Sequence, residues 1–200
     1  MPTKKKLIVY IVIGLVFYCF NTVKAATIRN AIYLSYISGF NKVCDFVEDL
    51  GYDTEGVPID LAYTFDTVLD CGFRIDIGLG PISYMYGDVT YYDIPIRATV
   101  GYMLPFRLFR PYIRAGLSYH FDHGDYVKDN AGLGFVGGVG LEIGKKDKFS
   151  FFIEALYDTA KATFKGKAIY FDEYYYYYYT VTKEEDIKVN GFMLNIGFIF

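Results

Sequence analysis

The last residues of the chain, Asn190–Phe200, read NGFMLNIGFIF. Large apolar side chains occupy every second position, which places them on one face of an extended strand. They are Phe192, Leu194, Ile196, Phe198 and Phe200. The positions between them are Gly191, Met193, Asn195 and Gly197. This period of two predicts a β-strand with one apolar face and one small or polar face.

The same alternation recurs upstream, for example in residues 73–80, 94–102 and 113–120. In each stretch Phe, Ile, Leu, Val, Ala or Tyr alternates with Arg, Asp, Thr, Ser, His or Gly. Eight strands are predicted, over residues 29–38, 56–65, 71–84, 91–104, 111–121, 133–144, 149–159 and 187–200. An even number of antiparallel strands can close into a barrel, so we expect an all-β, eight-stranded antiparallel barrel.

The two faces of these strands indicate which side is outside. The polar face is rich in glycine with scattered charges, which suits a narrow polar interior. The opposite face is a continuous apolar band, which suits lipid. Because alternation alone does not say which face is out, a soluble lipocalin-like barrel or a sandwich is the alternative.

Composition supports one exported domain. The chain has 53% hydrophobic residues, with Tyr 22, Phe 18 and Gly 20, which excludes a disordered chain and favours strands. Lys4–Lys6, the apolar run Leu7–Phe20 and Val23–Ala25 predict a signal peptide over residues 1–25, cleaved after Ala25. A membrane anchor is the alternative, but the run is shorter than the ~20 residues that a spanning helix needs. Residues 26–200 then form the barrel domain.

Charge argues against a nucleic-acid partner. Four of the 20 Lys and Arg residues lie in residues 1–25, so residues 26–200 carry 16 cations against 23 anions, a formal charge of −7. Export together with a transmembrane barrel predicts the bacterial outer membrane.

The lengths of the connections orient the predicted barrel. Segments 66–70, 105–110 and 145–148 are short, and short turns belong on the periplasmic side. Segments 39–55, 122–132 and 160–186 are long and are therefore expected outside the cell, with both termini in the periplasm. The short connection at 85–90 does not fit this scheme. Cys44 and Cys71 fall at opposite ends, so we expect no disulfide between them.

Three stretches carry a family resemblance: RPYIRAGLSYHF (residues 110–121), GLGFVGGVGLEIG (residues 132–144) and the final NGFMLNIGFIF. Together with the signal they resemble the eight-stranded outer-membrane barrels of OmpA-type, OmpX-type and opacity-type surface proteins, over Thr27–Phe200. This resemblance implies that the last strand is read by the barrel-assembly machinery through Leu194, Ile196, Phe198 and Phe200. Outer-membrane lipid is the other implied partner.

Seven charged residues are predicted to face the barrel interior: Asp60, Arg74, Asp76, Arg97, Arg114, Glu142 and Glu154. An unpaired charge in a narrow lumen costs several kcal/mol, so we expect arginine–carboxylate pairs across the lumen. Arg114 is expected to pair with Glu142 or Glu154. These two carboxylates could also be read as an acid/base pair, but no third partner is evident, and we expect no enzyme activity.

The cluster His120-Phe121-Asp122-His123-Gly124-Asp125 has metal-ligand residue types. Its spacing matches no recognised ligand pattern, and such residues are common in loops. We therefore expect no metal and no cofactor.

A tyrosine tract lies in the longest predicted connection, at Tyr174, Tyr175, Tyr176, Tyr177, Tyr178 and Tyr179. Tyrosine favours strands, so the seventh and eighth strands are predicted to continue as a hairpin turning near Asp172-Glu173. Two interpretations stay open. The tyrosines form an interfacial girdle, or they form a contact surface that recognises an extracellular or host ligand.

Two functions follow from this arrangement. The first is a monomeric surface barrel with a structural or adhesive role and no open pore. The second is a small porin-like channel, although eight strands leave an interior just wide enough for side chains. A lipid-acting enzyme is a more distant third.

Overall fold

A computed structural model describes residues 26–56, 59–87, 89–144, 149–172, 174 and 176–200. The predicted signal peptide, residues 1–25, and the predicted turn 145–148 lie outside the described residues. Eight strands form the body of the molecule: β1 (Ala26–Ile37), β3 (Ile59–Leu69), β4 (Phe73–Leu79), β6 (Tyr91–Met103), β7 (Phe109–Gly124), β9 (Gly132–Gly144), β10 (Ser150–Asp158) and β13 (Phe192–Ile199).

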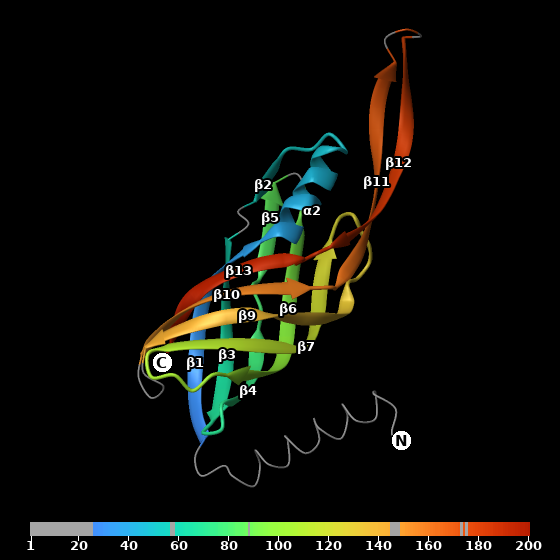
Figure 1. Cartoon of the computed structure of the whole chain (residues 1–200). Helices are drawn as coiled ribbons and strands as arrows, with labels where there is room; N and C mark the ends of the chain where they lie inside the picture. Colours follow the sequence, from blue (N-terminus) through green and yellow to red (C-terminus); the bar gives the residue numbers. More distant parts are fainter. Residues whose placement is uncertain (1–25, 57–58, 88, 145–148, 173, 175) are drawn as a thin grey trace, which may run out of the picture.

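These strands close into an antiparallel barrel. Each of the eight strands pairs with the next one along the chain, including β6 with β7. The last strand, β13, pairs with β10 on one side and with the first strand, β1, on the other, which closes the sheet. Ile32 lies opposite Phe198, and the backbones of Asn30 and Phe200 hydrogen-bond in both directions. The eight-stranded antiparallel barrel predicted from alternation is therefore confirmed (Figure 1).

The outward face of the barrel is apolar. Phe65, Ile77, Val100, Ile113 and Val139 come from five different strands, and their side chains are between 51% and 62% exposed. A soluble barrel would bury such side chains inside and expose its charges. Here the charged side chains are inside, so the fold is that of a transmembrane β-barrel. Among the described residues, no helix is long and apolar enough to cross a bilayer.

The strand predicted over residues 71–84 is interrupted in the structure. The segment predicted over 71–84 divides into β4 and β5 (Ser83–Gly87), because Pro81 has no N–H for a ladder hydrogen bond. Short β2 (Thr54–Gly56) precedes β3 and pairs with β5. Since β5 pairs with the start of β6, this hairpin continues past the barrel wall, which explains the short connection at 85–90.

The two ends of the barrel differ. The start of β1, Phe200, the β3–β4 and β6–β7 connections, the end of β9 and the start of β10 lie at one end, which we call the terminal end. The opposite end, the loop end, carries α2 (Ser38–Glu48), β8 (Val127–Asp129), β11 (Lys161–Asp172) and β12 (Tyr177–Lys188). This division agrees with the one predicted from connection lengths (Figure 1).

The sequence predicts a long connection over residues 39–55, and the structure has helix α2 within it. Phe40, Val43, Phe46 and Val47 recur at the spacing of three and four residues that places them on one helix face, and all four are buried. The helix begins against the chain entering β13. A Cβ on Gly39 would lie 2.2 Å from the backbone oxygen of Lys188, so only glycine allows this close approach.

The two cysteines lie at opposite ends of the barrel. Cys44 is in α2 at the loop end, Cys71 is in the β3–β4 turn at the terminal end, and both are free thiols. The 11 residues of β3 that separate the two ends span about 36 Å. A disulfide requires Cα atoms within about 7 Å.

We expect a mild oxidant to form no Cys44–Cys71 bond in the folded protein. Burial also raises the pKa of the Cys44 thiol, which lowers its reactive thiolate fraction. Mass spectrometry after non-reducing digestion measures the crosslink, and the same protein oxidised after unfolding is the control. A crosslink formed in the folded state would show that this topology is wrong.

Candidate functional site

Arg74 is buried inside the barrel, between two carboxylates. Its Nε lies 3.0 Å from Asp66 Oδ1 and its Nη2 lies 2.7 Å from Asp76 Oδ1. Its guanidinium also stacks over the Tyr112 ring, 4.4 Å from the centroid. Alternation along β3, β4 and β7 points all four side chains inward, where they are almost fully buried.

Arg114 extends this network across the barrel. One of its Nη atoms lies 3.5 Å from Asp76 Oδ2 on β4, and the other is ion-paired with Glu154 on β10. Asn195 of β13 donates to the same Glu154 carboxylate at 3.0 Å. The pairs therefore connect strands that are not neighbours in the sheet.

A second group is centred on Glu142. Glu142 accepts from Arg29 Nη1 at 2.6 Å, from Ser150 Oγ at 2.7 Å and from Arg110. Arg29 also pairs with Asp66, which joins this group to Arg74. Charge-assisted bonds therefore join side chains from β1, β3, β7 and β9 inside the lumen.

At the loop end of the lumen, His120 lies between two aspartates. Its Nδ1 is 2.8 Å from Asp93 Oδ2 and its Nε2 is 3.3 Å from Asp158 Oδ2. Ser118 donates to Asp158 at 2.9 Å, and Arg97 Nε is 3.8 Å from the same carboxylate. A nucleophilic serine needs a hydrogen bond to its general base. In this arrangement the Ser118 hydroxyl is bonded to Asp158, and the imidazole is bonded to the same carboxylate and to Asp93, so the serine and the histidine are joined through Asp158.

The predicted interior residues are almost all brought together. Six of them are buried in the lumen: Arg74, Asp76, Arg97, Arg114, Glu142 and Glu154. Asp60, the seventh, is only partly buried near the start of β3, apart from the ion pairs described above. Five partners were missed in the sequence: Arg29, Asp66, Arg110, Asp93 and Asp158. Asp93 lies four residues before Arg97, and Asp158 lies four residues after Glu154, so the period of two places each aspartate on the same inward face as its neighbour. The alternation therefore predicts both of them.

The His-Asp cluster at residues 120–125 is divided by the strand. His120 and Asp122 face inward and are buried, whereas Phe121 and His123 face outward and are exposed. Neighbours on a strand point to opposite faces, so the two histidines cannot share an ion. Within the described ranges, no three His, Cys, Asp or Glu side chains come together as metal ligands would.

Helix α2 covers the lumen at the loop end. Its buried face packs in one apolar cluster with Met85, Tyr91 and Val136 of the barrel and with the base of β11 and β12. Phe164 of β11 lies 5.8 Å from Phe46 and 5.5 Å from Tyr91, measured between ring centroids. An apolar cluster therefore joins α2, the loop end of the barrel and the base of the hairpin.

Beyond this cluster, β11 and β12 form a two-stranded hairpin that projects past the barrel (Figure 1). The last strand pair before the turn is Asp172–Tyr177. The predicted hairpin, which turns near Asp172-Glu173, is therefore confirmed. Asp172 Oδ1 accepts from the backbone N–H of Tyr174 at 2.9 Å. The tract is carried away from the barrel wall, where an interfacial girdle would lie.

The aromatic side chains of the hairpin are largely unburied. Tyr174 and Tyr176 are each 83% exposed, Tyr178 is 73% exposed and Tyr179 is 42% exposed. Ring stacking across the strands orders some of them, as between Tyr170 and Tyr179 with centroids 5.7 Å apart. Tyr175 and the side chain of Tyr177 lie outside the described residues.

Ion pairs hold the base of the hairpin. Glu184 lies 2.6 Å from Lys128 and 2.8 Å from Lys165, and these bonds lower the pKa of Glu184 to about 2. Lys183 pairs with Asp49, which follows α2, and lies over the Phe46 ring, 5.2 Å from its centroid. The hairpin is thus anchored to α2 and β8, while its tip is exposed.

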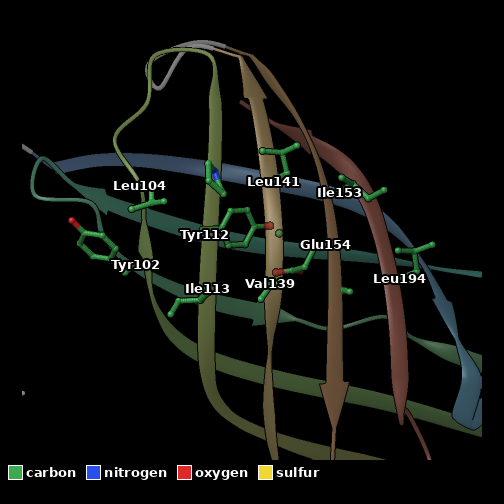
Figure 2. Close-up of a pocket in the computed structure, with 12 residues that line it drawn as sticks. Tyr102, Leu104, Tyr112, Ile113, Val139, Leu141, Ile153, Glu154 and Leu194 are labelled. Atoms are coloured by element: carbon green, nitrogen blue, oxygen red, sulfur yellow. The ribbon is translucent and has the colours of Figure 1, made fainter. Parts of the chain in front are cut away.

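A shallow groove of about 670 Å³ lies on the outer wall of β6, β7, β9 and β10 (Figure 2). Tyr102, Ile113, Val139 and Leu194 are among the outward side chains that line it. A Cβ on Gly140 would lie 2.3 Å from the Tyr112 ring, so glycine lets that ring pack against β9. Apolar side chains dominate the lining, which suits hydrocarbon chains.

Comparison with known proteins agrees on the fold. No protein-family model matches the chain, and no curated protein matches it. A solved structure that is similar is the crystal structure of the outer membrane protein OprG from Pseudomonas aeruginosa. It shares 12% identity with this chain, with 87% of this chain and 93% of OprG covered and a TM-score of 0.51. This similarity supports an outer-membrane type of β-barrel fold, and the narrower OmpA-, OmpX- or opacity-type resemblance stays a prediction.

Proposed function

We propose that this chain is an outer-membrane β-barrel with a closed lumen, which acts at the cell surface by binding a partner through the β11–β12 hairpin. The apolar outer wall supports membrane insertion. The short turns at the terminal end and the long connections at the loop end support an orientation with the hairpin outside the cell.

The exposed aromatic hairpin is the observation that carries this proposal. The side chains of Tyr174, Tyr176 and Tyr178 are largely exposed, so they contribute little to the packing of the barrel. Tyrosine supplies rigid amphipathic contact area at low entropic cost, and functional residues are concentrated in loops held by a rigid scaffold.

Surface display tests the proposal. The full chain is expressed in a non-adherent bacterial strain, and the cells that attach to host cells, to matrix proteins and to one another are counted. We expect attachment to rise when the chain is displayed. Equal attachment with and without the chain would contradict the adhesive role.

The closed lumen leads to a separate prediction about the channel alternative. Arg29, Arg110 and Glu142 cross the lumen, and α2 covers the mouth, so no continuous water path is expected. In planar bilayers the refolded protein should give no discrete conductance steps, whereas a general porin measured in the same bilayers should. Steps that scale with the amount of folded protein would favour the channel.

The assembly signal also belongs to this proposal. The Phe200 side chain is 54% exposed on the outer wall, and its backbone pairs with Asn30. Phe200→Ala keeps that pairing and removes only the ring. We expect it to reduce insertion into the outer membrane while export continues, as measured by the heat-modifiable gel mobility of membrane fractions. Phe192→Ala, an outward aromatic at the other end of β13, is the control. Normal insertion of the Phe200 variant would remove the assembly role.

A further inference from the structure

The β11–β12 hairpin has an open edge. It belongs to a three-stranded sheet in the order β12–β11–β8, in which β8 pairs with β11 only at Thr163 and Phe164, near the base. Among the described strands, β12 pairs only with β11 and is therefore an edge strand. The backbone groups of an edge strand are a template for pairing with another strand.

The distal half of this edge has none of the usual protection. Residues 177–182 read YYYTVT, with no charge, proline or glycine, whereas the next four residues, 183–186, are all charged. Natural edge strands are commonly protected by charges, proline or bulges that prevent association. The uncharged stretch is rich in the aromatic and β-branched residues that favour strands. Its exposed side chains include Tyr178 and Val181, at 73% and 41%.

A lipid bilayer is a poor partner for this tip. Open strand edges do not enter hydrocarbon, because their backbone N–H and C=O groups would have no hydrogen-bond partner there. Asp172 at the turn adds a carboxylate to the leading end. A partner that contributes a strand would satisfy the edge and cover the aromatic faces together.

We propose that this strand comes from a second copy of the chain on an apposed cell. The inference rests on the proposed surface function and names its partner. Two copies in one membrane point the same way, so their β12 strands could pair only in parallel. Two copies on facing membranes meet tip to tip, and their β12 strands run antiparallel about a two-fold axis. Antiparallel pairing is the more stable arrangement for strands.

Charge places the pairing at the tip. With the two-fold axis at Thr180, Tyr179 lies opposite Val181 and Tyr178 lies opposite Thr182 of the other copy. Such aromatic and β-branched cross-strand pairs stabilise a sheet. In a register closer to the base, with the two-fold axis at Glu184, the Glu184 carboxylates of the two copies would lie opposite each other. Like charges directly opposite each other destabilise a sheet, so the overlap is limited to the uncharged stretch.

A charge-swap experiment tests the pairing. Bacteria display the full chain, Thr180→Lys or Thr180→Glu, each strain with its own fluorescent label, and mixed clusters are counted by flow cytometry. Asn130→Lys adds the same charge at an exposed loop-end position away from the β12 edge and is the control. Heat-modifiable gel mobility confirms that every variant is folded.

Wild-type and Asn130→Lys cells should cluster. Either Thr180 variant alone should cluster about tenfold less, because like charges meet at the axis. A mixture of Thr180→Lys and Thr180→Glu cells should cluster again, because opposite charges then meet. Wild-type clustering by either variant alone, or a mixture no better than its components, would overturn the inference.

The outcome is separable from that of the proposed function. If wild-type cells bind host cells or matrix but do not cluster with one another, the second-copy inference fails and the surface function stands. If they attach to none of these, both fail.

Discussion

Replacing Arg114 by alanine is expected to lower the free energy of unfolding by about 3–5 kcal/mol. The residue is 7% exposed, and its guanidinium is shared between Glu154 and Asp76. Removing it leaves Glu154 as a buried carboxylate without its cation, and an uncompensated charge in a poorly hydrated lumen is costly. Asp76 retains Arg74, so the main loss falls at Glu154.

The measurement is a urea series on protein refolded in detergent, scored by the fraction that keeps the gel mobility of the folded barrel. Arg107→Ala is the matched control, because Arg107 is an exposed arginine in the β6–β7 connection. It should change the midpoint little. Adding Glu154→Gln to the Arg114 variant should restore part of the stability, since the remaining charge is removed. An unchanged midpoint for Arg114→Ala would mean that the polar face is not enclosed.

Much of the fold was predictable, because a strand in a membrane barrel alternates between lipid and lumen at every residue. The period of two in residues 73–80 and 113–120 was enough to place Arg74 and Arg114 inside. The ends of strands were less predictable. Asp66 and Arg110 were assigned to connections, although β3 and β7 continue through them. Alternation weakens where a strand leaves the bilayer, because both faces then meet water or protein.

The pairing within the lumen was only partly predictable. The expectation that Arg114 pairs with Glu142 or Glu154 left the choice between two strands. The structure pairs it with Glu154, and Glu142 instead binds Arg29 and Arg110. That choice depends on the stagger of strands around the closed barrel, which is a property of the whole sheet. Local patterns in one strand carry no information about it.

Helix α2 shows a different limit. Its apolar spacing is present in residues 40–47, but a single short helix within a long connection is stabilised by what it covers rather than by its own propensity. Its buried face packs on Tyr91 and Phe164, which are far from it in the sequence. The helix is therefore predictable only together with the barrel and the hairpin base on which it packs.

Shortening the hairpin is expected to reduce attachment strongly and leave the barrel folded. Gly166 and Lys183 lie directly opposite each other, so replacing residues 167–182 by Asn-Gly closes the ribbon with a tight two-residue turn. The base keeps its contacts, because Phe164 stays in the apolar cluster and the Lys183–Asp49 pair is retained.

We expect the shortened protein to keep the folded gel mobility, since loop-closure entropy changes slowly with length and the barrel strands are intact. Attachment should fall by about tenfold or more, the effect of losing aromatic residues at the centre of a contact. A control of full length, with Tyr174, Tyr176 and Tyr178 changed to threonine, separates the rings from the backbone edge. If it clusters cell to cell as the wild type does, the edge carries the binding; if it behaves as the shortened chain does, the rings do. Undiminished attachment of the shortened chain would mean that another surface binds.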